Sequence, residues 1–169
     1  MHYLRTLGPL VLDHRFRRMM DVLLRTAEAI YEARGLRFRA RWTSTYLLLA
    51  ESGPLGVMDI AGGIGITHPA VITILEEMAA AGVVTSVTDR SDRRRRQVAL
   101  TRRGLKLKPE LLRLWEELAV AQAERFMAEG CDIVAVLNGV EDGLVERSLS
   151  AEVLQRLEAR ESRKPASTR

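Results

Sequence analysis

The sequence predicts a mainly α-helical fold with one small β-hairpin, and three observations support this prediction. Apolar residues recur every three or four positions along most of the 169-residue chain, which is the spacing of amphipathic helices. Between residues 83 and 101 the spacing changes to alternation around a polar turn at Ser91-Asp92, which is typical of a hairpin. Glycines interrupt the helical pattern where helices are expected to end: Gly35, Gly53, Gly82 and Gly130.

Four helices are expected before the hairpin. Their predicted ranges are residues 10–34, 41–52, 57–63 and 67–81. Gly53-Pro54 cannot continue the second of them, and a turn at residues 64–66 separates the last two. Pro69 lies in the first turn of the fourth helix, where its missing N–H costs little.

The hairpin leads into a long helix. Its two strands are expected at residues 83–89 and 95–101. Thr101 is a suitable N-cap for a helix over residues 102–129, in which Pro109 could introduce a kink.

A last helical region is expected over residues 132–160. Gly139 and Gly143 weaken it, so it forms either one helix or two that meet near residues 148–150. The polar residues 161–169 are expected to form a disordered tail. The length of the chain favours a single domain over residues 1–169.

The composition of the chain excludes several classes of site and of protein. Cys131 is the only cysteine, so an intrachain disulfide and a thiolate metal cluster are excluded. The apolar runs are too short for a signal or a membrane-spanning segment, so we expect a cytoplasmic protein without a membrane partner. The histidines lie far apart and show no metal-ligand spacing. No motif supports a catalytic site, and no cofactor or metal is expected.

The turn of the hairpin is densely charged. It contains Arg90, Arg93, Arg94 and Arg95, although the net charge of the whole chain is only +4. Clustered arginine is the electrostatic signature of a nucleic-acid binder. Solvent and salt screen the repulsion at a hairpin tip, and DNA phosphates would turn it into attraction. The alternative interpretation is a solvated charged surface.

Two segments carry a family resemblance. The helix-turn-helix "PLGVMDIAGGIGITHPAVITILEEMAAAGVV" is followed by "DRSDRRRRQVALTRRG", the hairpin and the start of the next helix. Both resemble the MarR family of bacterial winged-helix regulators. "LGPL", "RW" and "THPAV" resemble a branch that is often fused to an acetyltransferase domain, for which this sequence has no room. We therefore do not expect that activity.

The resemblance implies an architecture and partners. It places a winged helix-turn-helix at residues 41–104, between dimerisation helices at residues 10–34 and 105–160. It implies a homodimer that binds a pseudo-palindromic operator in double-stranded DNA. Most members of this family are repressors that a small-molecule effector or oxidation releases. Here Cys131 is more readily explained as a passive thiol than as a redox sensor, because it has no resolving cysteine.

The resemblance also assigns the two faces of the recognition helix. The buried positions are Val71, Ile74, Leu75 and Met78. The outward positions are Thr67, His68, Pro69, Ile72, Thr73, Glu76 and Glu77. No Lys or Arg occurs between residues 67 and 81, so this helix offers no bidentate contact to guanine. Thr67, His68, Ile72 and Thr73 remain as candidates for contact with base edges, and the arginines of the hairpin as candidates for contact with phosphates.

A ligand pocket is a further hypothesis. Trp42 and Tyr46 are four residues apart on one helix face, and Arg41 and His14 are possible polar neighbours. Family members often place an effector pocket in this region. The alternative is that both aromatic rings fill the core, which helical spacing alone explains.

The sequence therefore predicts a DNA-binding regulator that is not an enzyme and that acts as a homodimer. One apolar stripe before the DNA-binding lobe contains Leu12, Phe16, Met19 and Leu23. A second stripe after it contains Leu144, Val145, Leu149, Val153 and Leu157. They form the dimer interface, or they pack within one chain. The alternative function is a protein-interaction module whose basic wing binds an acidic partner protein.

Overall fold

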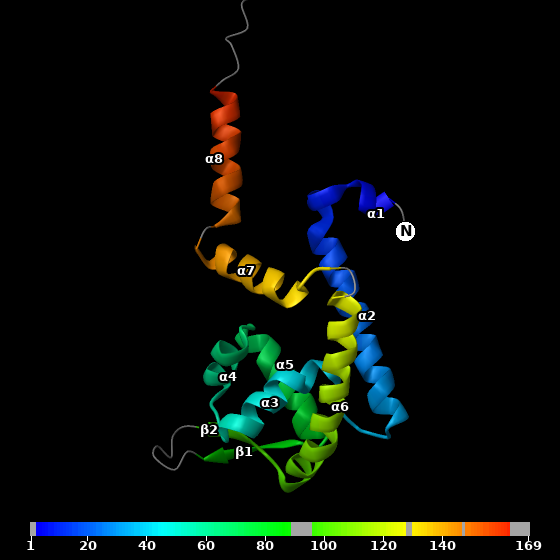
Figure 1. Cartoon of the computed structure of the whole chain (residues 1–169). Coiled ribbons are helices and arrows are strands. Elements are labelled where there is room, and N and C mark those ends of the chain that lie inside the picture. The colour runs from blue at the N-terminus through cyan, green and yellow to red at the C-terminus, as the bar shows by residue number, and fades with distance from the viewer. Residues whose placement is uncertain (1–2, 89–95, 128–129, 147, 163–169) are drawn as a thin grey trace, which may run out of the picture. The chain divides into compact units, whose positions relative to one another are not determined.

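The computed structural model describes residues 3–88, 96–127, 130–146 and 148–162. The chain divides into two compact units, Met1–Leu111 and Leu112–Arg169, and each is described by itself. The predicted segment 89–95 of the hairpin and residues 163–169 of the predicted tail lie outside the described residues. The mainly helical fold class with one hairpin is confirmed (Figure 1).

The first unit contains most of the predicted elements. Its helices are α1 (Tyr3–Thr6), η1 (Gly8–Val11), α2 (Leu12–Ala33), η2 (Ala40–Trp42), α3 (Thr43–Ser52), α4 (Val57–Ile64) and α5 (His68–Ala80). Its strands are β1 (Val84–Thr88) and β2 (Arg96–Leu100), and α6 (Arg102–Met127) begins in this unit and ends in the second. The helix α1 was not predicted, because a helix of four residues is too short to show an apolar period.

The second unit is helical. It contains the end of α6, then α7 (Ile133–Glu146) and α8 (Leu149–Glu161). The final helical region is therefore two helices, which was one of the two predicted outcomes. Ser148 is the N-cap of α8, and its Oγ accepts a hydrogen bond from the N–H of Ala151. Because α8 includes Glu161, it extends one residue into the predicted tail.

A sharp turn joins α4 to α5. Gly65 ends α4 in the left-handed region at φ 69°, and its N–H bonds to the carbonyl of Ala61. A residue with a side chain would be strained at this φ, whereas glycine adopts it freely. The two helices consequently meet at 111°. This pair is the predicted helix-turn-helix.

The hairpin packs beside this pair. β1 and β2 are antiparallel, with register from Val84↔Leu100 to Thr88↔Arg96. Leu55, between α3 and α4, forms an isolated antiparallel β-bridge with Val98, because its N–H and its carbonyl both hydrogen-bond to the backbone of Val98. The sequence pattern did not predict this β-bridge. β1 contacts α5 and β2 contacts α3, so the hairpin packs against both of these helices (Figure 1).

An aromatic cluster forms part of the core of the first unit. Phe38 lies at its centre, with ring centroids 5.3 Å from Tyr31, 5.5 Å from Trp42 and 5.4 Å from Tyr46. All three contacts are edge-to-face, which is a favoured geometry for aromatic pairs. The cluster therefore joins α2 to η2 and α3.

Candidate nucleic-acid interface

The recognition helix α5 has one buried and one exposed face. Val71 and Met78 are fully buried, Leu75 is buried, and Ile74 is half-buried, so the predicted inward face is confirmed. The four residues proposed for base contacts are all exposed: Thr67, His68, Ile72 and Thr73. Thr67 is the N-cap of α5 and the other three lie in its first half, next to the turn that joins it to α4.

The hydroxyl of Thr73 already forms a hydrogen bond within its own helix. Its hydroxyl donates to the carbonyl of Pro69 at 3.2 Å. A threonine in this arrangement keeps its oxygen lone pairs as acceptors but has no donor to spare. The exposed face of α5 therefore offers a hydroxyl acceptor at Thr73, an imidazole at His68 and an apolar contact at Ile72.

The prediction that Glu77 points outward is wrong. Its carboxylate is half-buried and accepts a 3.0 Å hydrogen bond from the indole Nε1–H of Trp42. Arg41 donates to the other carboxylate oxygen. Glu77 lies three residues after the half-buried Ile74, at the edge of the buried stripe, where a helical wheel does not decide the direction of a long side chain.

The predicted arginine cluster belongs to the segment that connects the two strands of the hairpin. Thr88 and Arg96 are the last paired residues of the two strands, and the chain between them contains Arg90, Arg93, Arg94 and Arg95. These four arginines are outside the described residues. Arg96 at the start of β2 is exposed. The hairpin therefore carries this segment on a base that is packed against α5.

The base of the hairpin is tightly joined to α6. Thr101 acts as the predicted N-cap: its Oγ1 accepts a hydrogen bond from the N–H of Gly104 at 2.9 Å and donates to the carbonyl of Gly82 at 2.7 Å. Gly104 is buried, and a Cβ at this position would lie 2.3 Å from the carbonyl oxygen of Val83. Only glycine permits this close approach of α6 to the start of the hairpin.

The structure does not gather the four residues of the predicted ligand pocket. Trp42 and Tyr46 are buried in the aromatic cluster, and the hydroxyl of Tyr46 donates to the carbonyl of Gly104. The alternative interpretation, in which both rings fill the core, describes their positions. Arg41 donates a hydrogen bond to the carboxylate of Glu77, which Trp42 also contacts.

His14 lies apart from these residues. It is exposed near the start of α2, and its Nδ1 lies 3.0 Å from Asp13 Oδ1. This hydrogen bond lowers the pKa of the Asp13 carboxyl. α2 reaches η2 through Glu28, and the length of α2 between His14 and Glu28 is roughly 21 Å at 1.5 Å per residue. His14 therefore does not line a site with Trp42.

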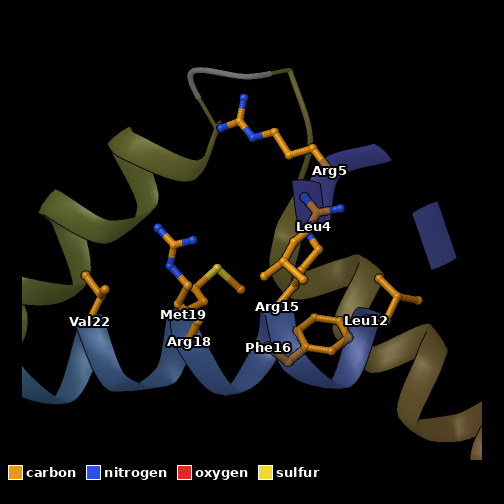
Figure 2. A pocket seen from close by; sticks show the side chains of 8 residues that line it. All are labelled: Leu4, Arg5, Leu12, Arg15, Phe16, Arg18, Met19 and Val22. Atoms are coloured by element: carbon orange, nitrogen blue, oxygen red, sulfur yellow. The ribbon is translucent and has the colours of Figure 1, made fainter. Parts of the chain in front are cut away.

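A different hollow lies along the first half of α2. Its volume is about 410 Å³. Figure 2 shows Leu12, Phe16 and Met19 on one side of α2, with Leu4 and Arg5 from α1 opposite them. Its remaining lining residues are Arg15, Arg18 and Val22. Sequence reasoning identified the apolar stripe but missed the hollow, because α1 was not predicted.

The described residues give no sign of a metal centre or a single membrane-spanning helix. No three His, Cys, Asp or Glu side chains among them lie together as metal ligands would. No single described helix is long and apolar enough to cross a membrane. The bent pair of α4 and α5 passes the same test of length and composition only when both helices are taken together.

The helix-turn-helix and the hairpin beside it define a winged helix-turn-helix fold. Solved structures of transcriptional regulators share it. BpsR of Bordetella bronchiseptica, whose DNA binding 6-hydroxynicotinic acid regulates, has a TM-score of 0.62 and 22% identity, over 78% of this chain and 93% of BpsR. MepR of S. aureus, in complex with DNA, has a TM-score of 0.60 and 23% identity, over 78% of this chain and 96% of MepR.

PcaV of Streptomyces coelicolor, a transcriptional regulator in complex with its natural ligand, is similar as well. Its TM-score is 0.60 and its identity 17%, over 83% of this chain and 94% of PcaV. Neither a protein-family model nor a curated protein matches the sequence. The solved structures therefore confirm the predicted winged helix-turn-helix fold.

Proposed function

We propose that this protein is a transcriptional regulator of the MarR family that binds DNA in the cytoplasm and has no enzymatic activity. One arrangement carries the proposal: the exposed face of α5 lies beside a hairpin whose connecting segment contains four of the arginines singled out above. A recognition helix that enters the major groove, next to a basic loop that reaches the backbone, is a recurrent way of binding duplex DNA. DNA-bound MepR supports it.

The recognition helix and the hairpin contribute differently to DNA binding. The exposed face of α5 has no cationic side chain, so it contributes hydrogen bonds and apolar contact but little electrostatic attraction. The arginines of the hairpin supply that attraction, because each guanidinium that neutralises a phosphate releases a counterion. We infer that affinity comes largely from Arg90, Arg93, Arg94 and Arg95, and base preference from Thr67, His68, Ile72 and Thr73.

A homodimer is part of the proposal. The stripe on α2 leaves 44% of Leu12 and 43% of Phe16 exposed, and the stripe on α7 and α8 leaves 88% of Val145 and 61% of Leu149 exposed. Apolar surface of this extent is typical of an interface with a second copy. Two copies related by a two-fold axis would present two recognition helices to an inverted repeat. Bound there, the dimer would act as a repressor.

The hollow on α1 and α2 suits a small-molecule effector. Leu4, Phe16 and Met19 give it apolar walls, and Arg5 and Arg15 bring guanidinium groups to it (Figure 2). This combination suits a small organic anion with an apolar body. The regulation of BpsR by 6-hydroxynicotinic acid supports this class of ligand. Phe16 and Met19 also belong to the dimer stripe, so an effector bound here would act at the edge of the interface between copies.

Benzoate and benzamide test the effector site. We expect benzoate to raise the thermal unfolding temperature of the native protein, and the Arg15→Ala variant to lose this effect. Benzamide has the same ring without the charge and should be inactive. Equal effects of benzoate and benzamide would contradict an anion site.

A second candidate function is a protein-interaction module whose basic wing binds an acidic partner protein. Two observations favour it: α5 has no Lys or Arg, and a hollow of about 260 Å³ lies between α5 and the hairpin. Its lining includes Ile72, Val84 and Val98, which would accept an apolar side chain from a protein more readily than a nucleotide.

Competition binding separates the two functions. A labelled duplex, obtained by selection from a random pool, is titrated at several salt concentrations against a scrambled duplex and against polyglutamate. A regulator should prefer the selected duplex by more than about a thousandfold, with a steep salt dependence. Efficient displacement by polyglutamate, without any preference between duplexes, would favour the protein-interaction module.

A further inference from the structure

The three residues of η2 are held from two sides by glutamates of different helices. On one side, Glu77 of α5 accepts hydrogen bonds from Trp42 and Arg41. On the other, Glu28 of α2 accepts a 2.9 Å hydrogen bond from the N–H of Ala40. We propose that these contacts, here called the η2 clamp (Glu28, Ala40, Arg41, Trp42 and Glu77), position the recognition helix relative to α2. This inference rests on the proposed DNA-binding function.

The contact with Glu77 is built into the core of the lobe. Trp42 is 5% exposed, so its indole N–H lies where water does not serve as an acceptor, and Glu77 supplies the acceptor. Arg41 is half exposed and neutralises the same carboxylate. A carboxylate satisfied in this way is not free to contact a base. Glu77 is therefore a positioning residue of α5 and not part of the surface that meets DNA.

The contact with Glu28 satisfies a backbone group that η2 cannot satisfy itself. Ala40 is the first residue of η2, and the first N–H groups of a helix have no partner within it. Glu28 provides that partner from α2, and the hydroxyl of Tyr31, one turn later on α2, lies 3.4 Å from Thr43 Oγ1 at the start of α3. A shift of α2 would therefore move η2, and through Trp42 and Arg41 it would move Glu77 and α5.

Because α2 carries the proposed dimer stripe and the effector hollow, the clamp joins those features to the recognition helix. Coupling of this kind requires a physical connection between α2 and the recognition helix, and breaking that connection must affect both. The clamp supplies one that uses hydrogen bonds to two charged groups, which are stronger than those between neutral groups. Its members also lie within one compact unit of the chain.

A double-mutant cycle on the full-length protein tests the clamp. We expect Glu28→Ala and Glu77→Ala each to weaken binding to the selected duplex roughly tenfold, within the usual range of coupling between sites. Both changes open the same connection, so the double variant should bind no more than about twofold more weakly than either single variant. Base preference and salt slope should stay unchanged, because no contact with DNA is lost. The matched controls are Glu32→Ala on α2 and Glu51→Ala on α3, which remove exposed carboxylates outside both the clamp and the recognition helix.

Two further measurements keep the result independent of folding and of the DNA function. Glu28→Gln and Glu77→Gln retain an acceptor oxygen and should restore most of the affinity; they replace the alanine variants if those do not fold. Hydrogen exchange of the DNA-free protein should speed up in α5 in both alanine variants and in neither control. If wild type selects no duplex, the proposed function is wrong and hydrogen exchange alone decides the clamp. Multiplicative losses in the double variant, or a changed base preference in Glu77→Ala, would overturn the inference.

Discussion

The hydroxyl of Tyr46 on α3 donates a 2.7 Å hydrogen bond to the carbonyl of Gly104 in the first turn of α6. Tyr46 is fully buried, and this bond joins residues 58 positions apart in the sequence. On its other side, Gly104 meets the carbonyl of Val83 at the start of the hairpin. The pair therefore fixes α3, α6 and the hairpin base together, which holds the wing beside the recognition helix.

Burial raises the pKa of Tyr46 to about 12. The unfolded chain has a tyrosine pKa of about 10, so the unfolded state loses this proton first as the pH rises. Stability from Tyr46 is therefore complete below pH 10 and falls as the pH rises from 10 to 12, by roughly 1.4 kcal/mol at pH 11. Denaturant unfolding of wild type and Tyr46→Phe at pH 8 and pH 11 measures it.

The Tyr46→Phe variant should be less stable than wild type at pH 8, by about 0.5–1.5 kcal/mol for the lost hydrogen bond. This difference should shrink or reverse at pH 11, because phenylalanine does not ionise. A difference that is the same at both pH values would contradict a raised pKa for Tyr46.

Gly104→Ala should destabilise the fold. The new Cβ would lie 2.3 Å from the Val83 carbonyl oxygen, so α6 or the hairpin base must shift. Overpacking of this kind costs typically 1–3 kcal/mol. Thermal unfolding measures it, with Gly139→Ala on α7 as the matched control: no atom lies within 4 Å of a Cβ there, and alanine should be neutral or stabilising. Equal stability of both variants would place Gly104 outside a tight contact.

Arg94→Ala should weaken binding to every duplex about equally. The lost phosphate contact carries no base information, so the salt slope should fall by about one while base preference is retained. Titration of the duplex at several salt concentrations measures both quantities. Arg160→Ala, which removes an exposed arginine of α8, is the control and should change neither. Unchanged affinity and slope in Arg94→Ala would remove this residue from the interface.

His68→Ala and Thr73→Ala should change base preference. Both side chains lie on the exposed face of α5, and each hydrogen bond to a preferred base is worth about 1–3 kcal/mol of discrimination. Thr73 donates its hydroxyl proton to Pro69, so it should act as an acceptor and prefer a base that presents a donor. Competition between single-substituted operators measures the effect. If both variants keep the preferences of wild type, the protein recognises the shape of the duplex instead.

Local signals predicted the elements well. The helical period, the glycine stops and the Thr101 cap depend on residues within a few positions of each other, and the structure has them close to the predicted bounds. The buried face of α5 followed from the same period because Val71, Leu75 and Met78 repeat at three and four residues.

Contacts between distant residues were not predictable from the sequence. The direction of Glu77 depends on the indole N–H of Trp42, 35 residues earlier, which needs an acceptor once it is buried. The β-bridge between Leu55 and Val98 depends on how closely the loop before α4 approaches β2. The predicted pocket placed His14 near Trp42 because the sequence did not show where α2 meets η2.

The most direct test of a dimeric, sequence-specific DNA-binding regulator is to select bound duplexes from a random pool, sequence them, and compare the full site with its isolated half. We expect an inverted repeat whose half-sites lie about one helical turn apart. A sedimenting dimer of the 19.0 kDa chain should bind it at least a hundredfold, on the order of 3 kcal/mol, more tightly than it binds the half-site. No enriched sequence, or a 19.0 kDa monomer that binds the half-site as tightly as the full repeat, would contradict it.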